Sequence, residues 1–378
     1  MARSPLPPRE GISATRLRAP GGAGMHPRMH QPVPPSVGAW LRADFPDASE
    51  DEILDLTATR ELTAEDGSRV SLEDPVIPGG FYWFHRYVPP EERVPVEIGI
   101  VHEDEHLLVV DKPHFLASTP NGRFVRECVV TRMRVERDDP DLVAIHRLDR
   151  VTAGLLLLSK RPETRGAYQT LFQNRRIRKT YRALAALPPA PVSAPVPQPV
   201  DGADRAGSQT TTAAEVPLGW AACRTTLLHK ESGDRQVREV PGPPNSRTEA
   251  RLVRILGEAD LPTFADLPTD DGLPPSTNPQ ADGDLPTAPT GATPRIGEFE
   301  LTPHTGRTHQ LRVHMNGWGT PILGDPVYPV DLGPDPYDLS SPLQLLASRL
   351  EFRDPLTGEG RVFDSRLSLR PTRSQLAI

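Results

Sequence analysis

The sequence predicts a mixed α+β protein. Apolar strand-like runs such as residues 107–110 are interrupted by helical patterns, without the regular strand–helix alternation of a doubly wound sheet. No internal repeat is visible, so a solenoid or a propeller is not expected. The 45 prolines and 29 glycines among 378 residues indicate that part of this length is linker.

Composition divides the chain into a tail, a small module and a large domain. Residues 1–36 are rich in Pro, Gly and Arg without periodicity, so we expect a disordered tail. Residues 37–95 join a helical pattern to alternating residues and Gly-containing turns, which predicts a small α+β module. Residues 96–378 form the large domain, interrupted by low-complexity insertions at about 188–213 and 257–294.

The large domain begins with strands at 98–101 and 107–110, and the leucine run after Gly154 predicts a third, buried strand. A helix is expected from Pro162, because proline is favoured at the first helical position and apolar residues follow at helical spacing. The sheet then resumes in "YRALAAL" and "GEFELTP". A second helix is expected in "GRTHQLRVHMNGWG", and "LLASRLEFRDPLTGEGRVF" predicts a hairpin.

The net charge of -7 hides a basic region. Seven acidic residues and no Lys or Arg lie between Leu256 and Pro294, so this segment accounts for the whole excess. From Asp141 to Ala186, ten Lys or Arg residues face three acids. Such a basic stretch is typical of a protein that binds a phosphate backbone, although a solvated basic face would look the same.

Several functional classes are not expected. The isolated Cys128 and Cys223 fit neither a disulfide framework nor a zinc motif, which favours a reducing compartment. No stretch resembles a signal peptide or a membrane span, so we expect a cytoplasmic protein without membrane contact. A GxGxxG motif, a phosphate loop and a serine elbow are all missing, and we expect no cofactor.

Asp149 is the strongest catalytic candidate. In "AIHRLDRVTAGLLLLSK" it lies among His146, Arg147 and Arg150, directly before the apolar strand. An acid beside arginines is usually a surface ion pair. A carboxylate at the entrance to a core requires a nearby cation, however, and a paired carboxylate in a pocket can act as a nucleophile or base.

Two further residues are candidates from their settings. Tyr181, in "RKTYRALA", is either a core aromatic or a ring that stacks on a nucleobase. Arg307 precedes the second helix, from where its guanidinium could reach Asp149; a surface arginine is the alternative. A metal site is not expected, because His304, His309 and His314 are spaced five apart and share no face of a helix or strand.

Four ordered motifs resemble those of the RluA-type pseudouridine synthases: "HRLDRVTAGLLLLSK", "RKTYRALA", "HTGRTHQLRVHMNGWGTPILGDPVY" and "LLASRLEFRDPLTGE". The resemblance covers about residues 96–187 and 296–367. It implies the pseudouridine-synthase fold, a mixed and mainly antiparallel sheet with flanking helices and a central catalytic cleft. Residues 37–95 resemble the small RNA-binding module that precedes many such synthases.

The resemblance also implies roles for individual residues. Asp149 would be the nucleophile, Tyr181 would stack on the uracil and help to remove the C5 proton, and Arg307 would form the ion pair with Asp149. Arg147 is a candidate to take the place of the flipped nucleotide. The other expected RNA-binding residues are His146, Arg150, Lys179, Thr308, His309 and Gln310.

The sequence therefore predicts a monomeric RNA pseudouridine synthase that isomerises uridines in rRNA or tRNA without a cofactor. Attack at C1′, attack at C6 and a glycal route stay open. An RNA-binding or ribosome-assembly factor on the same fold is the alternative, although a pure binder has no need of a carboxylate that faces phosphates. A hydrolase with an aspartyl nucleophile lacks a second carboxylate at a fixed local spacing.

Overall fold

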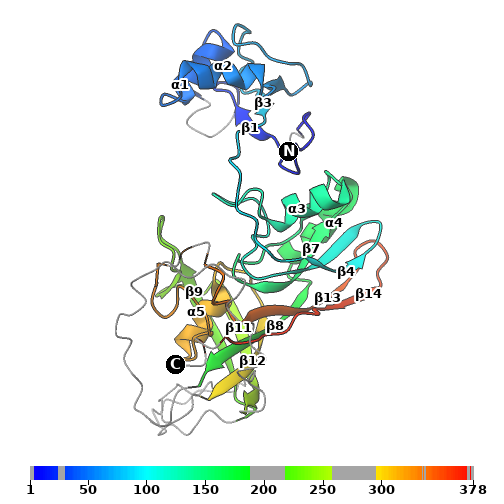
Figure 1. Cartoon of the computed structure of the whole chain (residues 1–378), viewed down its shortest axis with the longest axis vertical. Helices are drawn as coiled ribbons and strands as arrows, with labels where there is room; N and C mark the ends of the chain where they lie inside the picture. Colours follow the sequence, from blue (N-terminus) through cyan, green and yellow to red (C-terminus); the bar gives the residue numbers. More distant parts are fainter. Residues whose placement is uncertain are drawn as a thin grey trace. The chain divides into compact units, whose positions relative to one another are not determined.

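The structure is a computed structural model, and it describes residues 4–23, 30–187, 218–257, 295–333, 335, 338–372 and 375. The chain forms two compact units (Figure 1). The first unit combines Met1–Arg93 with Thr119–Leu142, and the second combines Val94–Ser118 with Val143–Ile378. The division after Arg93 lies near the expected module boundary after residue 95, whereas Thr119–Leu142 was expected in the large domain.

The first unit packs helices against a three-stranded antiparallel sheet. Its strands β1 (Thr15–Arg18), β2 (Thr63–Ala64) and β3 (Phe81–Phe84) have the order β1-β3-β2. Helix α1 (Val37–Asp44) begins at Ser36, and α2 (Glu50–Ala58) begins with a capping box between Ser49 and Glu52. The core contains Trp40 from α1 and Tyr82 from β3, whose ring centroids lie 5.1 Å apart.

Strand β1 lies within residues 1–36, where the sequence predicts a disordered tail. That prediction is wrong for Thr15–Arg18, because this segment pairs along its length with Phe81–Phe84. The partner strand is distant in sequence, so local composition could not reveal the pairing. The insertions predicted at about 188–213 and 257–294 lie outside the described residues, apart from Gly257.

Helix α3 (Val129–Arg137) belongs to the first unit because the residues before it pack on segments of that unit. Val125 forms a small buried cluster with Ile12 and Val88. Arg134, on α3, donates a hydrogen bond of 3.0 Å to the carbonyl of Gly11. These contacts are non-local, which explains why the sequence pattern did not separate Thr119–Leu142 from the large domain.

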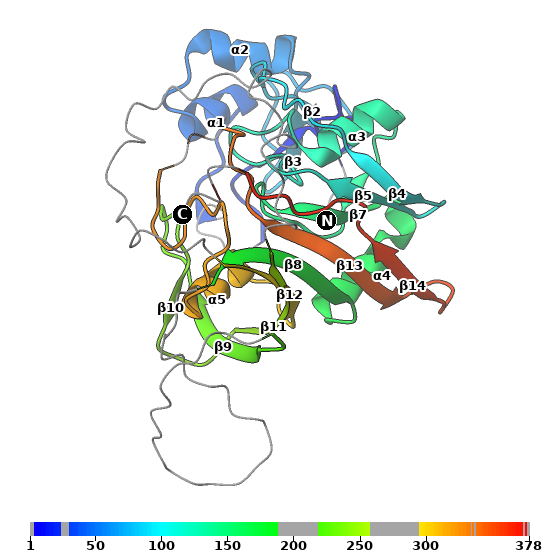
Figure 2. The same cartoon turned by 60° about the horizontal axis from the view of Figure 1, so that its bottom comes forward.

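The second unit is built on one mixed sheet of eleven strands within the described residues. The path runs β10-β9-β11-β12-β8-β13-β7-β5-β4, with β14 beside β13 and β6 beside β7 (Figure 2). Only β13 and β7 pair in parallel, so the sheet is mainly antiparallel, as predicted. The strands are β4 (Gly99–Glu103), β5 (Leu107–Lys112), β6 (Val143–Ala144), β7 (Ala153–Ser159), β8 (Arg178–Ala186), β9 (Ala221–His229), β10 (Arg238–Val240), β11 (Ser246–Leu256), β12 (Ile296–Pro303), β13 (Leu345–Arg353) and β14 (Gly360–Asp364).

The two helices of the second unit confirm the helical patterns in the sequence. Helix α4 (Pro162–Gln173) has Pro162 in its first turn and contributes Tyr168 to a core shared with β7. Helix α5 (Gln310–Gly317) buries Leu311 and Met315 against strands of the sheet. Figure 2 shows α5 on the concave side of the curve formed by β8, β12, β11 and β9. The predicted C-terminal hairpin is β13–β14.

Strand β7 is buried along its whole length and leads directly away from Asp149. Gly154 near its start has a φ of +112°, and a Cβ there would lie 2.4 Å from the carbonyl oxygen of Ala347 on β13. Only glycine fits this close approach of two backbones. Within the described residues no helix is long and apolar enough to cross a membrane.

Gly154→Ala should strongly destabilise the second unit, by about 3 kcal/mol or more, because it adds both backbone strain and a steric clash. Gly166→Ala is a matched control, since Gly166 lies inside α4 and a Cβ there has no atom within 4 Å. The control should gain up to about 1 kcal/mol in helix propensity. Urea unfolding of both variants measures the difference, and equal stabilities would contradict the packing of β7 on β13.

Candidate active site

Asp149 lies in the loop that precedes β7, and the backbone of this loop is fixed by side chains of the second unit. The Ser118 hydroxyl accepts a 3.0 Å hydrogen bond from the N–H of Leu148 and donates one of 2.9 Å to its carbonyl. The carbonyl of Asp149 itself accepts from the N–H of Thr152 at 3.0 Å. The Asp149 side chain keeps 34% exposure, so a substrate can reach it.

Lys112 and His114 support the same loop from the end of β5. The Nζ of Lys112 donates to the carbonyl of Arg150 at 3.1 Å, and Nδ1 of His114 lies 2.8 Å from the carbonyl of Val151. Lys112 is fully buried, and burial lowers its pKa to about 7 against the opposing charge of Asp149. Neither residue was predicted from the sequence, although a lysine that ends an apolar strand was a detectable signal.

Arg312 on α5 is the arginine that faces Asp149. Its Nη1 lies 3.7 Å from Oδ2 of Asp149, and its side chain is only 3% exposed. Asp325 fixes the guanidinium by two hydrogen bonds, of 2.7 Å to Nε and 2.6 Å to Nη2. The same guanidinium lies 5.2 Å from the ring centroid of Tyr328. A planar fork held in this way can orient a second carboxylate.

The expected pairing of Arg307 with Asp149 is wrong. Among the described residues, the basic side chains within 4.0 Å of the Asp149 carboxylate are Arg312 and His309. Arg307 precedes α5 on an exposed loop, and its Nε donates a 3.2 Å hydrogen bond to the carbonyl of Asn245. Arg312 was recognisable as the other arginine of "GRTHQLRVHM", since it lies inside an apolar helical run where a charge requires a partner.

Tyr181 lies on β8, half-buried, where its backbone is paired with Leu301 of β12 and Ala347 of β13. Burial, and after it the charge of Asp149, raise the pKa of Tyr181, so the phenol is protonated at neutral pH. Its hydroxyl has no hydrogen-bond partner within the part of the chain that the structure describes. Asp149 is therefore near enough to Tyr181 for its charge to affect the phenol.

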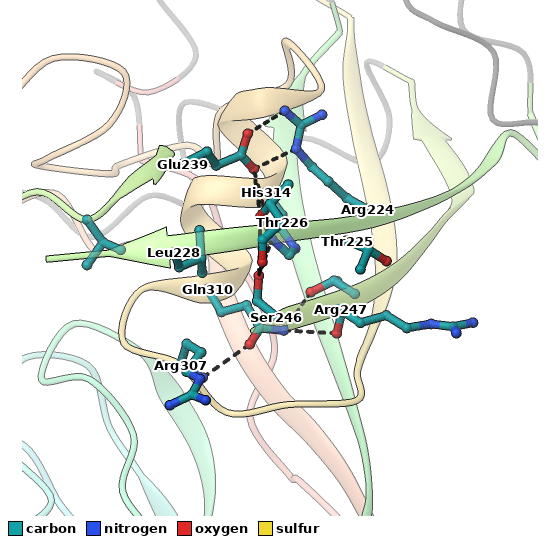
Figure 3. A network of polar contacts seen from close by, with 12 residues as sticks. Arg224, Thr225, Thr226, Leu228, Glu239, Ser246, Arg247, Arg307, Gln310 and His314 are labelled. Carbon is teal, nitrogen blue, oxygen red and sulfur yellow. Dashed lines mark hydrogen bonds and ion pairs between the residues drawn. The ribbon is translucent and has the colours of Figure 1, made fainter. Parts of the chain in front are cut away.

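Gln310 holds the turn before α5 and is not available to RNA (Figure 3). Its amide oxygen accepts hydrogen bonds from the N–H of Arg307 at 3.1 Å and the hydroxyl of Thr305 at 2.6 Å. Its amide nitrogen donates to the carbonyl of Arg247 and the hydroxyl of Thr248. The side chain is buried and uses its polar atoms inside the protein, which corrects its expected role in RNA binding.

His146 packs against the protein, and its expected contact with RNA remains a prediction. Its ring stacks on Phe172 at 4.4 Å between centroids, and its Nε2 accepts a 3.2 Å hydrogen bond from the N–H of Leu157. Burial, with a smaller contribution from the charge of Lys179, lowers the pKa of His146 to about 3. The imidazole is therefore neutral and fixes the loop against β7.

The other predicted RNA-binding residues differ in exposure. Arg147 and Thr308 are exposed, so contact with RNA remains a prediction for both. Arg150 donates a 3.0 Å hydrogen bond to the carbonyl of Phe115 and lies over the ring of that residue. Lys179 is partly buried, and burial followed by the charge of Arg175 lowers its pKa.

A polar network holds α5 against the strands behind it (Figure 3). His314 of α5 is fully buried, with Nε2 at 3.0 Å from the Thr226 hydroxyl and 3.2 Å from the Ser246 hydroxyl. Beside it, Glu239 and Arg224 form two hydrogen bonds of 2.6 Å. This network links α5 to β9, β10 and β11 on the side away from Asp149.

Residues 106–317 match the family model described as RNA pseudouridylate synthase. This match spans more than half of the 378 residues. The chain belongs to this family. Its predicted family, fold and enzyme class are therefore confirmed: it is an RNA pseudouridine synthase, an isomerase.

Two relatives by sequence agree with the family assignment. The chain is 28% identical over 271 residues to the dual-specificity RNA pseudouridine synthase RluA of Vibrio parahaemolyticus, which covers 68% of this chain and 78% of that protein. The protein of the same name from Salmonella typhi is 27% identical over 277 residues, 73% of this chain and 95% of that one. The solved structure of human RNA pseudouridylate synthase domain containing 1 is 17% identical, with a TM-score of 0.44, and covers 74% of this chain and 93% of that one.

Arg312→Lys should lower the rate of pseudouridine formation by about a hundredfold, because lysine cannot replace the two-pronged contact with Asp325. Arg307→Lys is the control, since it keeps the charge at the exposed position and should retain most of the activity. Single-turnover assays on the same RNA compare the two variants. A larger loss for Arg307→Lys would restore Arg307 as the partner of Asp149.

Proposed function

We propose that this synthase modifies uridines in structured rRNA or tRNA, with Asp149 as its nucleophile. The observation that carries the proposal is one partly exposed carboxylate, 3.7 Å from the Arg312 guanidinium, whose charge also contributes to the raised pKa of the Tyr181 phenol. The basic stretch from Asp141 to Ala186 supports an RNA substrate. Two curated relatives carry the words dual-specificity in their names, which agrees with more than one RNA target.

The chemistry requires a group that acts at the sugar or the base and a surface that holds the uracil. The C1′–N1 bond breaks, the uracil turns, and a bond from C5 to C1′ forms while the C5 hydrogen leaves as a proton. Asp149 is the group that opens the reaction, by addition at C1′, by addition at C6, or by removal of the C2′ proton to give a glycal. Arg312 keeps the carboxylate oriented during this step.

Tyr181 supplies the second part of the site. Its half-buried ring offers a face on which the uracil stacks after the nucleotide leaves the RNA helix, and such stacking offsets part of the cost of flipping. Its hydroxyl has no protein partner among the described residues and is close enough to Asp149 to sense its charge. The phenol is therefore placed to take part in the transfer of the C5 proton.

Asp149→Asn should abolish the release of tritium from RNA that carries 5-³H-uridine, with a loss of about 10⁴-fold or more. Asp138→Asn is a matched control, because Asp138 is an exposed residue in the left-handed conformation at the end of α3, which asparagine tolerates well. Unchanged release by Asp149→Asn would refute the assignment of the nucleophile. RNA that is bound without any modified base would favour the assembly-factor alternative.

The first unit, whose residues 37–95 were expected to bind RNA, is proposed to contact the RNA beyond the target uridine. A cavity of about 290 Å³ in this unit is lined by Arg9, Arg60, Arg86 and Arg126 with only two acids, Glu10 and Asp55. Arg86 is exposed and forms no ion pair within the described residues. Tyr87 beside it exposes 72% of its surface, which gives a base a ring to stack on.

Tyr87→Ala should weaken binding of a fluorescent single-stranded RNA by about tenfold, since stacking contributes roughly 1–3 kcal/mol per base. Arg86→Gln should reduce the slope of log affinity against log salt by about one, as expected for one lost phosphate contact. Arg69→Gln is the control, because Arg69 is exposed in the same unit but does not line the cavity. Unchanged affinity and slope in the first two variants would exclude this surface.

We further propose that one chain acts alone in the cytoplasm, where rRNA and tRNA are found. Asp149, Tyr181, Arg312 and Asp325 all belong to the same unit of one chain, which supports a monomeric enzyme. Light scattering of the purified protein during chromatography measures its mass in solution.

A further inference from the structure

We propose that His309 binds the 2′-hydroxyl of the target uridine beside Asp149 and so makes the enzyme select ribose over deoxyribose. The inference rests on the proposed function, because it takes Asp149 as the group that acts on the nucleotide. Beyond that function, it names the substrate group that is bound, the 2′-hydroxyl, and the protein atom that binds it, Nε2 of His309. The four observations that support it are a gap, a fixed ring, a strained backbone and a neutral imidazole.

The gap lies between two polar atoms that face each other. The Nε2 of His309 is 4.0 Å from Oδ2 of Asp149, and Nη1 of Arg312 is 3.7 Å from the same oxygen. Both distances exceed the 2.7–3.2 Å of a direct hydrogen bond. One ligand atom that bonds to Nε2 at about 2.8 Å can therefore lie next to both Asp149 and Arg312. The site is thus arranged for one shared polar group.

The imidazole of His309 is fixed from its other side. Its Nδ1 lies 3.1 Å from the Tyr328 hydroxyl, and the two rings meet edge to face. That hydroxyl is itself fixed by the N–H and the carbonyl of Val237, at 2.7 and 3.0 Å. Nδ1 is therefore occupied, and only Nε2 is left for a ligand. The side chain of His309 is 15% exposed, on a site where Asp149 is 34% exposed.

The backbone at His309 adopts a conformation that costs energy. Its φ is +54°, in the left-handed region that glycine and asparagine enter more easily. Although His309 precedes α5 as its N-cap residue, its side chain makes no capping hydrogen bond. The imidazole therefore does not cap α5 and contacts Tyr328 instead. Strained residues of this kind concentrate at functional sites.

The charge state of His309 selects the type of ligand. Burial, and after it the charge of Arg312, lower its pKa to about 4, although Asp149 and Asp325 oppose the shift. A neutral imidazole carries one ring proton, and the Tyr328 hydroxyl donates its own proton to the Val237 carbonyl, so Nδ1 donates to Tyr328 and Nε2 is an acceptor. A hydroxyl can donate its proton to Nε2 while its oxygen accepts from Nη1 of Arg312, which faces the same carboxylate. A uracil carbonyl can only accept, and it would place an oxygen against the Asp149 carboxylate.

Within an RNA chain the 2′-hydroxyl is the only free hydroxyl of a uridine, because O3′ and O5′ are esterified and uracil carries carbonyl and N–H groups. It is attached to C2′, which is bonded to the C1′ atom at which the glycosidic bond breaks. A carboxylate that acts at C1′ or at the C2′ proton is within reach of this hydroxyl. The 2′-hydroxyl is also the group by which proteins distinguish RNA from DNA.

The test uses two synthetic RNA stem-loops that contain the uridine found by pseudouridine mapping and differ only in ribose or 2′-deoxyribose at that position. Single-turnover rates are measured by nucleoside chromatography after digestion. The wild-type enzyme should convert the ribose substrate about a hundredfold faster than the deoxy substrate. His309→Ala should lower the rate on the ribose substrate by about ten- to a hundredfold but the rate on the deoxy substrate by less than about threefold. The ratio of the ribose rate to the deoxy rate should therefore fall.

Three further variants separate binding from folding. His309→Asn suits the left-handed backbone and should preserve the fold while it lowers the ratio. Tyr328→Phe removes the hydroxyl that fixes the ring and should lower the ratio less than His309→Ala. His314→Asn, on the same helix but turned away from Asp149, should leave the ratio unchanged whatever its effect on the rate.

The outcomes distinguish a failure of the proposed role of His309 from a failure of the proposed function. A ratio that stays at its wild-type value in both His309 variants overturns the role of His309. A wild-type enzyme that converts both substrates equally well overturns it too. No conversion of the ribose substrate by the wild-type enzyme contradicts the proposed function itself, and the inference would fall with it.

Discussion

The active site depends on one buried guanidinium shared between two carboxylates. Arg312 is almost fully buried, and a buried charge is stable only with a partner of opposite sign. Asp325 provides that partner through two short hydrogen bonds, which leave Nη1 directed toward Asp149. Because Asp325 fixes the arginine, the arginine can fix the carboxylate of Asp149 without enclosing it. The carboxylate thus stays both oriented and open to substrate.

The fold brings these three residues together from distant parts of the sequence. Asp149 lies in a loop whose backbone is held by Ser118 and by Lys112 at the end of β5. Arg312 is carried by α5, which the His314 network attaches to the neighbouring strands. The sheet itself requires Gly154, directly after the Asp149 loop, so that β7 can approach β13. The contacts that pack the second unit therefore also position the residues of the active site.

The sequence patterns predicted the elements whose formation depends mainly on residues close together in the chain. The leucine run of β7, the start of α4 at Pro162 and the β13–β14 hairpin all agree with the structure. Strand β1 was missed because it forms only by pairing with a distant strand. The choice of Arg307 over Arg312 failed for a related reason. Both lie in one motif, but Arg307 is on the exposed loop before α5, whereas Arg312 is on the helix and faces Asp149.

The most direct test of the central interaction is a double-mutant cycle on Asp325 and Arg312. Single-turnover rates would be compared for the wild type, Asp325→Asn, Arg312→Lys and the double variant on one RNA. If Asp325 acts through Arg312, the double variant is about as slow as the slower single variant. The reason is that either substitution alone already disrupts the contact from Asp325 through Arg312 to Asp149. Losses that multiply in the double variant would show that the two residues act independently, and would contradict the account.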